Sequence, residues 1–131
     1  MAGEPFSKDA QLARGERRYR RKVASPKAWQ AIIDAKQGPC RVCKLIESQF
    51  SIDLRGPIQY HHLLARGAST GGDDVADNIV PLHFVCHECV TTRVPSALAA
   101  LAASLTHSEY AYLLEKVGEP GIERLFGVPG E

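Results

Sequence analysis

The sequence predicts a single α+β domain with a structural zinc knuckle. The chain has 131 residues, the length of one ordinary domain. Helical patterns near both ends, at 25–38 and 96–118, flank a central region of short strand-like segments. Two Cys-x-x-Cys pairs, at 40–43 and 86–89, have the spacing with which short loops bind zinc.

The composition is that of a soluble globular protein, with 44% hydrophobic and 24% charged residues. No apolar run approaches the roughly 20 residues that a membrane span needs. The first residues also lack the apolar core of a secretory signal. We therefore expect a cytoplasmic protein without a membrane partner. In a reducing cytoplasm, the paired cysteines favour zinc over disulfides.

The net charge is only +1, but the charges are unevenly distributed. Residues 1–60 contain twelve Lys and Arg against six Asp and Glu, a balance of +6. Residues 61–131 contain four against nine, a balance of −5. A basic front half is expected where one face of a protein meets a polyanion.

Residues 1–24 are predicted to form a basic, flexible N-terminal arm that precedes a single domain over 25–131. The run "RGERRYRRK" at 14–22 places six basic residues around Tyr19. Such a run is equally consistent with a solvated face and with contacts to phosphates. The candidate nucleic-acid contacts are Arg17, Arg18, Arg20, Arg21, Lys22 and, in the central region, Arg66.

The first helix is predicted over 25–38. Ser25 suits the N-cap, Pro26 the first helical position, and Gly38 the end of the helix. Trp29 lies on an apolar face together with Ile32 and Ile33, since the three follow helical spacing. We therefore expect Trp29 to lie in the core rather than to serve as a nucleic-acid platform.

The central region is predicted to contain a hairpin, a loop, a strand and a short helix. Segments 50–54 and 58–64 have strand patterns, and Gly56-Pro57 between them predicts the hairpin turn. The Gly-rich segment 65–78 is expected to be a surface loop. A strand at 79–82 then leads into a helix that begins near His83 or Cys86 and is limited by Pro95.

Two helices are predicted at the C-terminal end. Segment 96–105 is rich in Ala and Leu, and segment 106–118 begins with a capping box formed by Thr106 and Glu109. Gly118 is predicted to end the second helix. The expected apolar stripe of that helix comprises Tyr110, Leu113, Leu114 and Val117.

The central motif resembles the HNH nuclease family. In "YHHLLARGASTGGDDVADNIVPL" and the following "CH" at 86–87, two adjacent His precede an Asn by about sixteen residues, and a further His follows. The preceding Cys-x-x-Cys is similar to that of the zinc-stabilised branch of the family. With "SLTHSEYAYLLEKVG" near the C-terminus, the chain is most similar to small phage-encoded HNH endonucleases. The resemblance covers residues 25 to about 118.

The resemblance implies a ββα-metal fold, in which a hairpin and a helix hold one divalent cation (Mg²⁺, Mn²⁺, Ni²⁺ or Zn²⁺). By position in the motif, His61 and His87 are the implied ligands of this catalytic cation. His62 is the implied general base, and Asn78 is implied to brace the loop and to hold the base in orientation.

The chemistry of phosphodiester cleavage requires these residue types. Imidazole titrates near neutrality, so His62 can take a proton from water at working pH. A cation can act as a Lewis acid on the phosphate and on the leaving oxygen. Adjacent side chains on a strand point to opposite faces, so His61 and His62 cannot easily bind one metal together.

Two alignments with the family motif share three zinc ligands: Cys40, Cys43 and Cys86. Without gaps, His83 is the fourth zinc ligand, and Cys89 is left over. With a shift of three residues, Cys89 completes the site, and Val90 stands where a metal-binding His should be. We favour the gap-free alignment, because it preserves the spacing between Asn78 and His87.

The resemblance implies a metal-dependent DNA endonuclease or nickase in the cytoplasm of a bacterial host. Phage relatives of this kind often act beside the terminase, which implies a role in DNA packaging or processing with terminase as a partner. The alternative is a non-catalytic zinc module that binds nucleic acid or a protein and whose HNH site has decayed.

Overall fold

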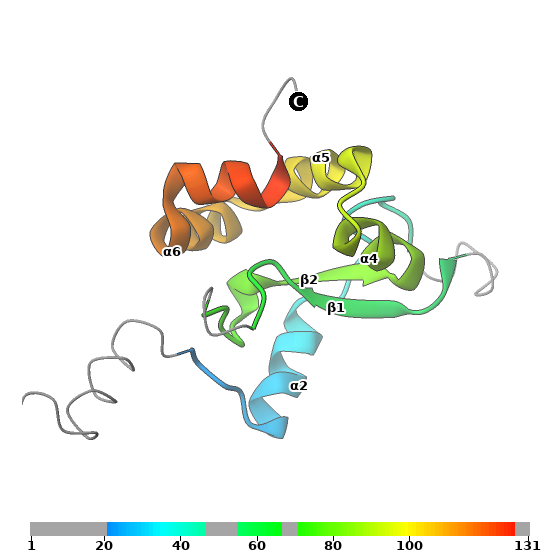
Figure 1. The fold of residues 1–131 in the computed structure, drawn as a ribbon. Coiled ribbons are helices and arrows are strands. Elements are labelled where there is room, and N and C mark those ends of the chain that lie inside the picture. The colour runs from blue at the N-terminus through cyan, green and yellow to red at the C-terminus, as the bar shows by residue number, and fades with distance from the viewer. Residues whose placement is uncertain (1–20, 47–54, 67–70, 128–131) are drawn as a thin grey trace, which may run out of the picture.

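The computed structural model describes residues 21–46, 55–66 and 71–127. Figure 1 shows a two-stranded sheet with helices on both sides. Strand β1 (Ile58–His62) pairs antiparallel with β2 (Ile79–His83), with Ile58 opposite His83 and His62 opposite Ile79. Helix α4 (Phe84–Thr91) begins directly after β2 and packs on both strands. The two strands and the helix therefore pack against one another as one unit.

The predicted hairpin differs from the strand pairing in the structure. Segment 50–54, its first strand, lies outside the described residues. The described partner of β1 is β2, on the far side of the Gly-rich loop in sequence. The strand predicted over 58–64 ends at His62, because Leu63 and Leu64 turn into the core and are almost fully buried. A short helical turn, η2 (Ala76–Asn78), leads into β2.

Helix α2 (Pro26–Ala35) lies on the side of the sheet away from α4 (Figure 1). Its predicted cap is confirmed, because Ser25 Oγ accepts a hydrogen bond of 3.1 Å from the Ala28 amide. None of its residues is buried, so the expectation that Trp29 lies in the core is wrong. Trp29 is half-buried and stacks on His62 instead.

Helices α5 (Pro95–Ser104) and α6 (His107–Phe126) cover the α4 side of the molecule (Figure 1). Pro95 is the first residue of α5, four residues after α4 ends, rather than a limit on α4 itself. The capping box of Thr106 and Glu109 is confirmed. Gly118 breaks α6 with a φ of 70°, as predicted, but a second helical segment follows to Phe126.

The predicted apolar stripe of α6 is only partly correct. Leu113 is fully buried and Val117 packs against the core. Tyr110 and Leu114 are exposed instead, because the fully buried Glu109 occupies the inward position in the first turn. The carboxylate of Glu109 is held by Arg41, Lys36 and the Thr106 amide, which satisfies the charge in the interior.

The core is formed between β2, α4, α5 and α6. Its buried hydrophobic residues are Cys40, Leu63, Leu64, Val80, Leu82, Cys86, Val90, Ala97, Leu98, Leu101 and Leu113. Cys40 and Cys86, two cysteines of the predicted zinc knuckle, are thus part of the same core as the C-terminal helices. Within the described parts of the chain, no helix has both the length and the apolar character to cross a membrane.

Candidate functional site

Four potential zinc ligands converge at the start of α4. Cys40 and Cys43 lie in the turn after α2, His83 is the last residue of β2, and Cys86 is in the first turn of α4. Their ligand atoms all lie within 4.8 Å of one another, and Cys43 Sγ is 3.2 Å from His83 Nδ1. Three thiols and one imidazole are a donor set that suits tetrahedral zinc, so the cluster is compatible with a structural zinc.

The environment of the cluster opposes the ionisation of all three thiols together. Burial and the neighbouring Cys40 raise the pKa of Cys86 to about 12, and burial raises the pKa of Cys43. Burial acts against ionisation of Cys40 as well, but backbone N–H groups of Cys43, His83 and Val42 lower its pKa. Three thiolates this close repel one another, and a Zn²⁺ ion would supply the charge that stabilises them.

The structure brings His83 into this group and leaves Cys89 out of it. Cys89 lies on α4 and packs half-buried against the core. His83 is 1% exposed, and its backbone N–H lies 3.4 Å from Cys40 Sγ. The fourth member of the cluster is therefore His83, as in the gap-free alignment.

His61 and His87 face each other beside the cluster. His61 comes from β1 and His87 from α4, and their ring centroids are 4.9 Å apart in an edge-to-face arrangement. Burial, followed by the nearby His87 and His62, lowers the pKa of His61 to about 4. His61 is therefore neutral at pH 7, which is the form of imidazole that binds a metal. Two imidazoles leave most positions on a cation open.

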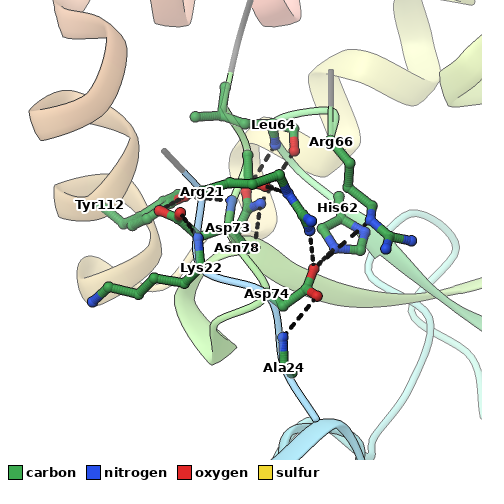
Figure 2. Close-up of polar contacts among 11 residues, drawn as sticks. Arg21, Lys22, Ala24, His62, Leu64, Arg66, Asp73, Asp74, Asn78 and Tyr112 are labelled. Atoms are coloured by element: carbon green, nitrogen blue, oxygen red, sulfur yellow. Dashed lines mark hydrogen bonds and ion pairs between the residues drawn. The ribbon is translucent and has the colours of Figure 1, made fainter. Parts of the chain in front are cut away.

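His62 lies on the other side of β1. Its ring stacks on Trp29 of α2, with centroids 5.7 Å apart and planes 9° from parallel. Its Nε2 atom lies 2.8 Å from Oδ1 of Asp74 (Figure 2). A carboxylate can only accept, so Nε2 carries the proton of the neutral imidazole and Nδ1 is the nitrogen that can take up another.

Asp74 is at the centre of a charged network. Arg21 and Arg66 approach its Oδ1, and the Ala24 amide donates to its Oδ2 at 3.0 Å (Figure 2). Burial acts against ionisation, but the Ala24 amide, His62, Arg21 and Arg66 hold the pKa of Asp74 below its usual range. Asp74 is therefore an anion against which His62 is oriented.

Asn78 is fully buried and ties the ends of the Gly-rich loop together. Its Oδ1 accepts from the Leu64 amide at 2.8 Å, and its Nδ2 donates to the carbonyls of Leu64 and Asp73 (Figure 2). Gly72 permits this approach, because a Cβ there would lie 1.9 Å from the Leu64 carbonyl oxygen. Asn78 thus hydrogen-bonds to both ends of the loop, whereas the side chain within hydrogen-bonding distance of His62 is Asp74.

The candidate phosphate contacts have different environments. Arg17, Arg18 and Arg20 lie outside the described residues. Arg21 is occupied within the fold, because it donates to Asp74 and to the Gly72 carbonyl. The Lys22 backbone pairs with Asp73 and Asp74, so the last part of the predicted flexible arm is anchored to the loop. Arg66 is 58% exposed and available to a ligand.

Sequence reasoning missed two residues of this site, Asp74 and Trp29. The signal for Asp74 was the adjacent acidic pair in "GGDD", directly after the glycines that allow close backbone approach. Asp73 takes a different role, since it accepts hydrogen bonds from the Lys22 amide and the Tyr112 hydroxyl. Trp29 has no such local signal, because its contact depends on how α2 packs on the sheet.

No family model matches the chain, and neither a curated protein nor a solved structure shows significant similarity to it.

Proposed function

We propose that the chain is a metal-dependent DNA endonuclease or nickase of the HNH type. The observation that carries the proposal is the convergence of His61 and His87, from a strand and the following helix, at a ring-centroid distance of 4.9 Å. The contiguous strand–strand–helix order and the adjacent Cys₃His cluster support it. A role in phage DNA packaging or processing, with terminase as partner, rests on the sequence resemblance alone.

In the proposed site, His61 and His87 would hold one divalent cation. Such a cation supplies Lewis-acid stabilisation of the phosphate and of the leaving 3′ oxygen. The Cys₃His cluster fixes the start of α4, and His87 lies one residue after the ligand Cys86. We therefore assign the zinc a structural role and the two histidines the catalytic one.

His62 is the proposed general base. Its Nδ1 takes the proton of a water molecule whose oxygen attacks phosphorus, while Asp74 holds Nε2 and balances the imidazolium that forms. The bond from phosphorus to the 3′ oxygen then breaks, and the 3′ oxygen takes a proton from bulk water, which leaves a 5′ phosphate and a 3′ hydroxyl. The scissile phosphate would lie across the end of β1, where His61 packs towards α4 and His62 packs towards α2.

The competing function is a non-catalytic zinc module that binds nucleic acid or a protein. One observation favours it: His62 packs on α2 through Trp29, whereas His61 packs on α4 through His87. The two rings therefore occupy opposite faces of β1. A binding module would use the Cys₃His cluster for stability and would not require the His pair to bind a cation.

A plasmid-nicking assay in Mg²⁺, Mn²⁺ or Ni²⁺ separates the two functions. We expect the wild type to nick and His62→Ala and His87→Ala to lose at least a hundredfold in rate. The matched control is His107→Ala, because His107 is exposed at the start of α6 and should leave the rate unchanged. Absence of nicking by the wild type in all three metals would favour the binding module.

A further inference from the structure

A cavity of about 450 Å³ opens beside the His62–Asp74 pair. It is lined by Val23, Ala24, Pro26, Trp29, Arg66 and Asp74. The cavity is thus formed by three parts of the chain: the segment that precedes α2, the start of α2, and the Gly-rich loop that follows β1. A volume of a few hundred Å³ is typical of sites that hold a small organic ligand.

The lining combines an aromatic ring with a cationic group. Trp29 lines the cavity, and its indole also stacks on His62. Arg66 lines it too, with its Nε atom 3.8 Å from Asp74 and its side chain 58% exposed. An indole stacks on any nucleobase, and a guanidinium binds phosphate through paired N–H groups.

The local charge favours an anion. Two guanidinium groups, from Arg21 and Arg66, share the single carboxylate of Asp74, which leaves an excess of one positive charge. Pro26 brings the N-terminal end of α2 to the cavity, and the first turn of this helix contains no acidic residue. The helix dipole therefore adds to the attraction.

We infer that this cavity binds one nucleotide unit of the substrate strand, with the base stacked on Trp29 and its phosphate held by Arg66. The inference rests on the proposed function for its choice of polymer, and it assigns to that function a substrate pocket next to the proposed base. A base held there would be unstacked from its neighbours, so the pocket selects single-stranded or locally opened DNA.

The chain contains a single tryptophan, so its fluorescence reports on this cavity alone. The zinc-loaded full chain would be titrated, without Mg²⁺, with deoxyadenosine monophosphate, a short oligodeoxyadenylate, deoxyadenosine and inorganic phosphate. We expect both nucleotides to quench Trp29, with the oligonucleotide binding more tightly. Deoxyadenosine should bind at least tenfold more weakly than its monophosphate, and inorganic phosphate should compete without quenching.

Variants test the two halves of the pocket. Arg66→Ala should weaken binding of the monophosphate about tenfold, and Arg66→Lys should restore part of the loss. Arg124→Ala is the matched control, since Arg124 is an exposed arginine on α6. Absence of quenching by either nucleotide, or an equal loss in Arg66→Ala and Arg124→Ala, would overturn the inference.

The result of this binding experiment does not depend on whether the protein is a nuclease. Deoxyadenosine monophosphate has no internal phosphodiester, so its binding does not depend on catalysis. Plasmid nicking without quenching of Trp29 would leave the nuclease and remove the pocket. Quenching that depends on Arg66, in a chain that does not nick DNA, would leave the pocket and remove the nuclease.

Discussion

The Nε2 atom of His62 lies 2.8 Å from Oδ1 of Asp74, twelve residues further along the chain. The contact joins the end of β1 to the far side of the Gly-rich loop. It exists because Asn78 and Gly72 hold the two ends of that loop against each other. In the proposed nuclease it makes Asp74 a positioning residue for the base.

Asp74→Asn should lower the cleavage rate about tenfold to a hundredfold, because the imidazole of His62 then no longer donates its hydrogen bond to a charged carboxylate. The effect should appear in the cleavage rate at saturating DNA, since it is on the orientation of His62. The measurement is single-turnover cleavage of a labelled duplex, with far-ultraviolet circular dichroism to verify the fold. Asp34→Asn, an exposed change on α2, is the control, and equal rates in both variants would contradict a positioning role.

Cys89→Ala should retain one zinc ion per chain, whereas His83→Ala should lose zinc affinity. The reason is that His83 Nδ1 lies in the ligand group and Cys89 does not. Atomic absorption on dialysed protein measures the content. Zinc removal by a chelator should also lower the melting temperature, because zinc binding contributes to folding free energy. Retention of zinc by His83→Ala and its loss by Cys89→Ala would reverse the assignment.

Glu109→Gln should destabilise the fold by about 3–5 kcal/mol at neutral pH, because it leaves Arg41 and Lys36 without their buried counter-charge. Although burial acts against ionisation, Arg41, Lys36 and the Thr106 amide lower the pKa of Glu109 to about 2.

A lowered folded-state pKa gives stability that is present above the ordinary glutamate pKa of 4.5 and is lost as the pH falls towards 2. The difference in unfolding free energy between wild type and Glu109→Gln should therefore shrink over that range. Denaturant titrations at several pH values measure it, and the contribution of the thiol cluster cancels in the difference. A difference that is independent of pH would show that the charge of Glu109 is not involved.

Asn78→Ala should destabilise the protein by about 3 kcal/mol, since it leaves the buried Leu64 amide and two carbonyls without their partner. The activity should fall together with the stability, because the loop that carries Asp74 is released. Urea unfolding compares it with Gln37→Ala, which removes an exposed amide after α2. If both variants unfold at the same urea concentration, Asn78 does not brace the loop.

Several features could be predicted from the sequence because they depend on residues a few positions apart. The Ser25 cap, the capping box of Thr106 and Glu109, and the break at Gly118 all follow from local backbone chemistry. The spacing of Cys40 and Cys43 likewise predicts two thiols that point to one metal. Such features depend little on how the rest of the chain packs.

The strand pairing and the apolar stripe of α6 could not be predicted in the same way. A strand pattern does not specify which strand pairs with it. Segment 50–54 is the predicted partner of β1, whereas its described partner is β2. Helical spacing placed Tyr110 and Leu114 inside, but the inward position belongs to Glu109. A buried carboxylate is stable only with its counter-charges, and these come from residues 68 and 73 positions away.

Local spacing along the chain is enough to predict the candidate zinc-ligand types and the helix caps. Three features are visible only in the tertiary structure. His83 rather than Cys89 joins the cysteine cluster, His62 lies within hydrogen-bonding distance of Asp74, and its ring stacks on Trp29. The physical reason is that these contacts join separate elements. Their geometry is set by how the strands and helices pack into one core, and no spacing along the chain encodes it.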